Sequence, residues 1–157
     1  MAKILIAYYT WSGNTGKIAE MIAKETGGVL FAMEPLAPYS GDYQAAVAQA
    51  KKEISEGFKP ELLKTTAPEA FDMVFIGSPK WWSTIAPPVA PFLSEKGLAG
   101  KTVVPFCTHG GGGRARLFTD IKTLCPDADV PEGFEVYGAG NGSTAKAVGK
   151  WVKQLMP

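Results

Sequence analysis

The sequence is poor in the residues that build metal sites and disulfide frameworks. Its 157 residues include two cysteines, Cys107 and Cys125, and one histidine, His109. The cysteines form no C-x-x-C pair, so no disulfide framework is indicated, and a reducing, cytoplasmic location is the default expectation. A lone histidine without cysteine or carboxylate partners at ligand spacing predicts no metal site.

Excess charge and long apolar runs are also missing. The chain has 16 lysines and arginines against 15 aspartates and glutamates, a formal net charge of +1. A charge this small predicts no general attraction to nucleic acid or anionic membranes. No stretch approaches the roughly 18 apolar residues of a membrane span, and the first apolar run, residues 4–9, is too short for the core of a signal peptide. Neither a membrane nor a nucleic-acid partner is expected.

What is present is the composition of one globular domain. Hydrophobic residues make up 46% of the chain and charged residues 20%, which is typical of a globular protein. No repeat, linker or low-complexity tract divides the chain, so residues 1–157 are expected to form a single domain. The sequence carries no information on the oligomeric state.

Continuous apolar runs alternate with helical patterns along the chain. The clearest runs cover residues 4–9, 73–77 and 102–107, and they lack the polar alternation of a half-exposed strand. Strands of this kind are covered on both faces, as in a parallel sheet. Weaker strands are expected at residues 29–33 and 134–137, nearer the sheet edges.

Five helices are expected between and after these strands. They cover residues 14–26, 43–56, 89–95, 114–124 and 144–155. The alternation predicts a three-layer α/β domain with a doubly wound, five-stranded parallel sheet and right-handed crossovers. In such sheets ligands bind beyond the carboxyl ends of the strands, so the three most unusual loops should meet there. These loops are residues 10–15, 78–84 and 108–114.

The first unusual loop, Thr10-Trp11-Ser12-Gly13-Asn14-Thr15, follows the first strand and leads into the first helix. Its hydroxyl and amide side chains offer hydrogen bonds, and Gly13 permits a tight turn that aims backbone N–H groups inward. The free N–H groups and the dipole of the helix favour an anion at this point. The loop does not fit a Walker A motif, which needs a lysine after its second glycine. An ordinary capped turn is the alternative, because Ser, Thr and Asn are common N-cap residues.

The second and third loops are rich in aromatic residues and in glycine, respectively. Trp81 and Trp82 are adjacent in a turn, and two large aromatics are costly to expose, so each must pack on the core, a partner or a ligand. The run from Thr108 to Gly113 can bring backbone N–H groups close to a ligand, because glycines present no side chains. Its start is similar to the oxyanion loop of lipases, but the chain has no G-x-S-x-G nucleophile elbow. His109 is either a surface or capping residue or a ligand contact.

Together the three loops resemble those of a known family. Residues 9–15 are similar to the T-x-[ST]-G-N-T phosphate loop of flavodoxins. Residues 77–82 and 105–111 look like the two flavin-ring loops of a bacterial flavodoxin-like branch. The resemblance covers nearly the whole chain. It implies a flavodoxin-like fold with strand order 2-1-3-4-5 and noncovalently bound FMN as the cofactor.

The resemblance also implies which residues bind the cofactor. The phosphate would lie on the first loop, and the isoalloxazine ring would contact the other two loops, with Trp82 against the ring. The implied FMN contacts are Thr10, Trp11, Ser12, Gly13, Asn14, Thr15, Ser78, Pro79, Lys80, Trp81, Trp82, Ser83, Thr108, His109, Gly110 and Gly111. No catalytic acid, base or nucleophile is implied, because the chemistry belongs to the flavin.

Two features bear on the direction of electron flow. Many flavodoxins carry glycine at position 83, in a peptide that responds to reduction of the flavin, and Ser83 makes a positive φ costlier there. Lys80, Arg114 and Arg116 lie near the predicted site, so its rim is expected to be positive and to suit an anionic visitor. A solvated basic helix start is the alternative interpretation of these charges.

Three functions follow from these features. The resemblance implies a flavodoxin-type protein that exchanges electrons with a redox protein partner. The basic rim and Ser83 favour instead an NAD(P)H-dependent FMN oxidoreductase that reduces quinones or similar small acceptors. The third interpretation is a flavin-binding module with no turnover of its own.

Overall fold

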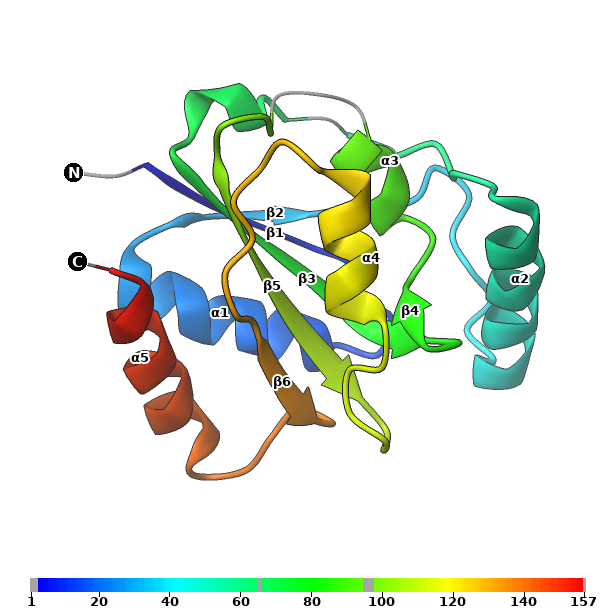
Figure 1. The fold of residues 1–157 in the computed structure, drawn as a ribbon. Coiled ribbons are helices and arrows are strands. Elements are labelled where there is room, and N and C mark those ends of the chain that lie inside the picture. The colour runs from blue at the N-terminus through cyan, green and yellow to red at the C-terminus, as the bar shows by residue number, and fades with distance from the viewer. Residues whose placement is uncertain (1–2, 65, 95–97, 157) are drawn as a thin grey trace.

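The computed structural model describes residues 3–64, 66–94 and 98–156, and its fold is drawn in Figure 1. The elements are β1 (Ile4–Tyr8), α1 (Asn14–Thr26), β2 (Val29–Ala32), α2 (Tyr43–Glu56), the short 3-10 helix η1 (Pro68–Ala70), β3 (Met73–Trp81), β4 (Thr84–Ile85), α3 (Val89–Ser94), β5 (Thr102–His109), α4 (Leu117–Leu124), β6 (Phe134–Tyr137) and α5 (Thr144–Leu155). Strands and helices alternate along most of the chain, as the sequence predicts.

The parallel strands lie in the order β2-β1-β3-β5-β6, which is the predicted order 2-1-3-4-5 once β4 is set aside. Tyr8 of β1 lies opposite Gly77 of β3, and Gly77 lies opposite Phe106 of β5. A Cβ on Gly77 would approach the Phe106 ring to 2.1 Å, so only glycine allows this close packing. The additional strand β4 pairs antiparallel with the end of β3. It was not predicted, because two residues carry no periodicity.

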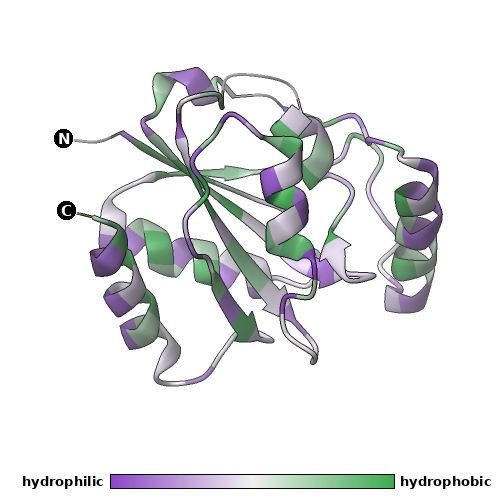
Figure 2. Cartoon of the chain, in the orientation of Figure 1, coloured by the Kyte–Doolittle hydropathy of each residue, from purple (hydrophilic) through white to green (hydrophobic). Residues whose placement is uncertain are grey.

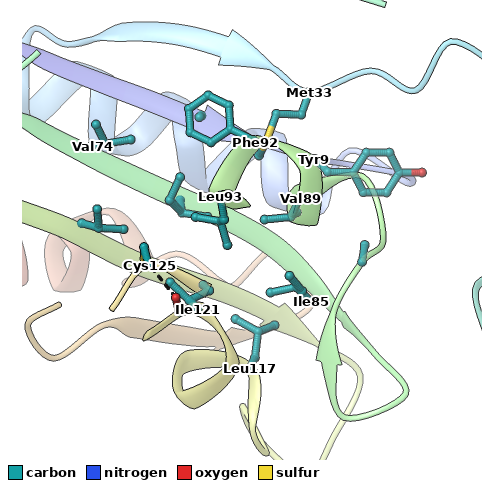
Figure 3. Close-up of a cluster of buried hydrophobic side chains, with 14 of the residues drawn as sticks. Tyr9, Met33, Val74, Ile85, Val89, Phe92, Leu93, Leu117, Ile121 and Cys125 are labelled. Atoms are coloured by element: carbon teal, nitrogen blue, oxygen red, sulfur yellow. Dashed lines mark hydrogen bonds between the residues drawn. The ribbon is translucent and has the colours of Figure 1, made fainter. Parts of the chain in front are cut away.

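The sheet separates two buried clusters, which confirms the three-layer prediction. One cluster joins Ile6 and Phe75 of the sheet to Ile18 of α1 and Trp151 of α5. The other lies under α3 and α4, and Figure 3 shows Val89, Phe92, Leu117 and Ile121 gathered there with strand residues. In Figure 2 the strands are largely hydrophobic, whereas the helices carry both hydrophilic and hydrophobic residues. The central strands β1, β3 and β5 are therefore covered on both faces, as continuous apolar runs require, whereas the edge strands β2 and β6 are partly exposed.

Helices α1, α2 and α5 begin and end where they were predicted, but other boundaries differ. β3 and β5 run on to Trp81 and His109, because their pairing continues to Pro79 opposite Thr108. Residues 78–81 therefore belong to a strand and not to the expected loop. α4 begins at Leu117, not at residue 114, because Ala115 and the glycines before it have a positive φ, which a right-handed helix cannot contain. α3 was expected to reach residue 95, which lies outside the described residues.

Helix α2 stands beyond the β3–β4 hairpin, at the right in Figure 1. The Asp42 carboxylate caps its first turn by accepting the Ala45 N–H, and Gly57 ends it with a φ of 67°. The helix buries Ala46, Ala50 and Glu53. Its contacts with β3 and the hydrogen bond from the Trp82 indole to the Val47 carbonyl place it beside the carboxyl end of that strand.

Candidate functional site

A cavity of about 400 Å³ opens at the carboxyl ends of the strands. Its walls come from the β1–α1 loop, the ends of β3, β5 and β6, and the start of α2. They consist of Trp11, Ser12, Asn14, Thr15, Tyr43, Pro79, Lys80, Trp81, Thr108, His109, Gly110, Tyr137 and Gly138. The volume lies within the roughly 300–1,000 Å³ typical of small-molecule sites. The three predicted loop regions thus meet around one cavity.

The β1–α1 loop turns directly into helix α1. Gly13 is the N-cap residue with a φ of 98°, and its N–H donates to the Thr10 hydroxyl at 3.1 Å. No side chain caps the helix, so its first-turn N–H groups have no side-chain acceptor. Ser12, Asn14 and Thr15 line the cavity at the same place. Free N–H groups, a helix dipole and short polar side chains together suit an anionic group.

Two hydrogen bonds tie the walls of the cavity to one another. The buried hydroxyls of Thr15 and Thr108 lie 2.7 Å apart and join the first turn of α1 to the end of β5. The Lys80 ammonium donates to the Gly111 carbonyl at 2.6 Å and joins the end of β3 to the glycine loop. The His109 Nδ1 accepts the Gly111 N–H at 3.2 Å, which fixes the imidazole against its own loop. These links hold the separate segments in one geometry.

The two adjacent tryptophans have opposite environments. Trp81 is 4% exposed and lines the cavity, with Tyr9 and Tyr39 packed edge-on at ring distances of 5.7 and 5.5 Å. Trp82 is 44% exposed and does not line the cavity. Its indole N–H donates to the Val47 carbonyl of α2 at 2.7 Å. The aromatic side chains that line the cavity are Trp11, Tyr43, Trp81 and Tyr137, and Trp82, which the resemblance placed against the ring, is not among them.

A strained turn follows Trp81. Trp82 and Ser83 have φ values of 54° and 70°, and they connect the paired residues Trp81 and Thr84. Two central residues with positive φ make a type I′ hairpin turn, which usually carries Asn-Gly. Each non-glycine residue held in this region costs about 1–3 kcal/mol. Ser83 therefore adopts the conformation that its side chain makes costly.

Two titratable groups beside cavity-lining residues have raised pKa values: Tyr39 packs against Trp81, and Cys107 precedes Thr108. Burial, and next the hydrogen bond from its hydroxyl to Glu53 at 2.5 Å, raises the pKa of Tyr39 far above its usual value. Burial likewise raises the pKa of Cys107 to about 12. Both groups stay protonated at neutral pH, so Cys107 offers no thiolate nucleophile. Among the residues that the structure describes, no cluster of His, Cys, Asp and Glu could hold a metal ion.

The expected positive rim is largely neutralised. Arg114 forms ion pairs with Glu132 and with Glu135, and the hydrogen bond to Glu132 raises the pKa of Arg114. Arg116 pairs with Asp120 at 3.1 Å. Glu132 and Glu135 lie too far along the chain for the sequence pattern to show them beside the arginines. Lys80 is the basic side chain that lines the cavity.

The predicted contacts divide into two groups. Those that line the cavity are Trp11, Ser12, Asn14, Thr15, Pro79, Lys80, Trp81, Thr108, His109 and Gly110. Those that are not among its lining residues are Thr10, Gly13, Ser78, Trp82, Ser83 and Gly111. Sequence reasoning missed Tyr43, Tyr137 and Gly138. Tyr137 ends β6, so the rule about the carboxyl ends of strands could have found it, whereas nothing in the sequence places Tyr43 here.

Comparisons with known proteins agree on one family. A family model described as flavodoxin matches residues 3–155. A candidate flavoprotein from Bacteroides eggerthii is 29% identical, with 100% of this chain and 99% of that one covered and a TM-score of 0.87. A flavoprotein from Lactobacillus acidophilus, solved in complex with FMN, is 25% identical over 86% of this chain and 93% of that one, with a TM-score of 0.76.

More distant structures share the fold. Flavodoxin 2 from Bacillus cereus is 23% identical, with 97% of this chain and 96% of that one covered and a TM-score of 0.63. No curated protein matches this chain significantly by sequence. The family match over nearly the whole chain therefore carries more weight than any single relative. Within the described part of the chain, no helix is both long and apolar enough to cross a membrane.

Proposed function

The chain belongs to the flavodoxin family, and from that premise we propose that it binds FMN noncovalently and exchanges electrons with a redox protein partner. The family and its fold support a flavin-based redox role. The observation that carries the FMN-binding part of the proposal is a cavity at which an uncapped helix N-terminus, aromatic side chains and a glycine loop meet. The two cysteines are free and buried, which fits the cytoplasmic location expected from the sequence.

The residues present fit the two ends of FMN. Its phosphate needs hydrogen-bond donors, which Ser12, Asn14 and Thr15 and the first-turn amides of α1 offer. Its planar ring system needs an apolar face, which Trp81 offers, and a wall without side chains, which Gly110 offers. The bound flavin would supply the reversible uptake and release of electrons.

The side chains at the site bind, orient and exclude water. Trp81 is held by Tyr9 and Tyr39, so a ring that stacks on it would meet a fixed face. The hydrogen bond between the Thr15 and Thr108 hydroxyls would fix the end of the cavity that receives the phosphate relative to the end that receives the ring. Nothing at the cavity requires a catalytic acid, base or nucleophile.

The competing function is NAD(P)H-dependent reduction of quinones or similar acceptors. It rested on a basic rim and on Ser83. Ser83 has the positive φ that glycine would favour, and Lys80 is the basic residue of that rim that lines the cavity, whereas Arg114 and Arg116 are paired with carboxylates. Lys80 is itself bonded to the Gly111 carbonyl. The charges therefore favour the electron carrier over the enzyme.

Steady-state kinetics with FMN-loaded protein separates the two functions. With NADPH or NADH and a quinone present, an electron carrier should show no turnover until a separate flavin reductase is added. Turnover with nicotinamide and quinone alone would contradict the carrier and support the oxidoreductase. A matched reaction with free FMN at the same concentration corrects for nonenzymatic reduction.

A further inference from the structure

The non-glycine residues with positive φ in the described chain gather at one junction. They are Trp82 at 54°, Ser83 at 70° and Ala115 at 48°. The junction forms because the N–H of Arg116, the residue after Ala115, donates to the Ser83 carbonyl at 3.0 Å. One side of it continues into Trp81 on the cavity wall. Strain concentrated beside a binding site persists only where surrounding contacts impose it.

Helix α2 supplies the contacts that hold the strained turn. The Trp82 indole N–H donates to the Val47 carbonyl at 2.7 Å, and the Lys51 ammonium lies 4.9 Å from the centroid of the same ring. The hydrogen bond and the cation–π contact both act on a side chain that is otherwise 44% exposed. The turn is thus fastened to α2 on one side and to Arg116 on the other.

The same helix also supports Trp81. The Trp81 ring packs edge-on against Tyr39, and the Tyr39 hydroxyl donates to Glu53 of α2 at 2.5 Å. Glu53 is held in turn by the Gln49 amide at 2.9 Å. Both tryptophans are therefore held by α2, Trp82 directly and Trp81 through Tyr39, although only Trp81 lines the cavity.

We propose that Trp82 is a positioning residue whose indole clamps the β3–β4 turn onto α2, and that the clamped turn holds Trp81 in place against the cofactor cavity. The clamp compensates for the missing glycine, because Trp-Ser does not favour a type I′ turn by itself. This inference rests on the proposed function, since the ligand that contacts Trp81 is taken to be the FMN ring.

The first test replaces Trp82 with phenylalanine, which keeps an aromatic ring and removes the N–H. Loss of one hydrogen bond predicts roughly threefold to tenfold weaker binding. The loss should be equal for FMN and for riboflavin, because the clamp acts at the ring and leaves the phosphate loop untouched. Titrations of each flavin by fluorescence quenching measure both affinities, and urea unfolding of the apoprotein reports whether the variant is folded.

The second test restores the turn without the clamp. Adding Ser83→Gly to Trp82→Phe should recover most of the lost affinity, because glycine adopts the positive φ without cost. Adding Ala115→Gly instead is the matched control, since it relieves strain outside the turn and should recover nothing. In a Ser83→Gly background, Trp82→Phe should weaken binding by less than about twofold. That comparison remains decisive if Trp82→Phe alone does not fold.

The outcomes separate the clamp from the proposed function. Wild-type protein that binds neither flavin would overturn the proposed function and the clamp with it. Wild-type binding with an unaffected Trp82→Phe variant would overturn the clamp alone. Equal recovery by Ala115→Gly and Ser83→Gly would also overturn it, because that result indicates a general effect of backbone strain. A loss confined to FMN would overturn it too, because that result indicates an effect at the phosphate end.

Discussion

The two ends of the cavity are built in different ways. The end that we propose for the phosphate is local: Thr10, Gly13 and the start of α1 form it within one short stretch of chain. The ring end is assembled from distant segments, since Trp81 depends on Tyr39 and on α2. An anion site can therefore be recognised from a short sequence motif, whereas the position of an aromatic side chain at the ring end depends on tertiary packing.

The largest effect should come from breaking the local end. Gly13→Ala places a side chain at a φ of 98° where nothing lies within 4 Å, so the cost is conformational and not steric. The strained loop would misdirect the helix amides, and FMN affinity should fall on the order of 100-fold. Riboflavin affinity should fall much less, as isothermal titration of both ligands would show.

Gly27→Ala is the matched control for that change. Gly27 ends the same helix with a φ of 72° and also has no neighbour within 4 Å. Both variants should lose roughly 1 kcal/mol of unfolding free energy. Only Gly13→Ala should lose FMN, so an equal loss of FMN in both would refute a special role for Gly13.

The link between the two ends should give the next largest effect. Thr15→Val leaves the buried Thr108 hydroxyl without its partner at 2.7 Å, which should cost about 1–3 kcal/mol of stability. Thr108→Val should cost a similar amount. The double variant should lose less than the sum of the two, as urea unfolding of all four proteins would measure. Additive losses would show that the hydroxyls do not interact.

The aromatic wall should have a smaller effect on binding. Trp81→Leu keeps an apolar side chain but loses the face for stacking, which contributes about 0.5–1.5 kcal/mol. Affinity should fall roughly threefold to tenfold for FMN and for riboflavin alike. A loss of affinity confined to FMN would indicate that Trp81 acts at the phosphate end, and it would contradict the assignment of Trp81 to the ring end.

The smallest effect at neutral pH concerns the thiol behind the ring end. Burial raises the pKa of Cys107 from 9.0 to about 12. Because the folded-state pKa is the higher one, the stability from the neutral thiol is complete below about pH 9 and is lost as pH rises toward 12. Unfolding free energies across this range should decline less steeply in Cys107→Val. An identical slope in both proteins would contradict the buried, neutral thiol.

The sequence predicts the fold better than it predicts the site. Apolar runs without alternation mark β1, β3 and β5 as covered strands, and the rule about strand ends places the cavity. The sequence alone does not show which tryptophan lines the cavity, because that depends on how far β3 continues beyond Gly77 and on the hairpin that β3 forms with β4. The ion pairs of Arg114 with Glu132 and Glu135 were equally hidden, since folding brings the partners together.

We propose that one cavity binds FMN, with its phosphate on the β1–α1 loop and its ring against Trp81. The most direct test is titration of FMN and riboflavin into the flavin-free protein, followed by flavin fluorescence. We expect saturable quenching at one flavin per chain, with FMN bound at least about tenfold more tightly than riboflavin because of the charged phosphate. Absence of quenching, or equal affinity for the two flavins, would contradict it.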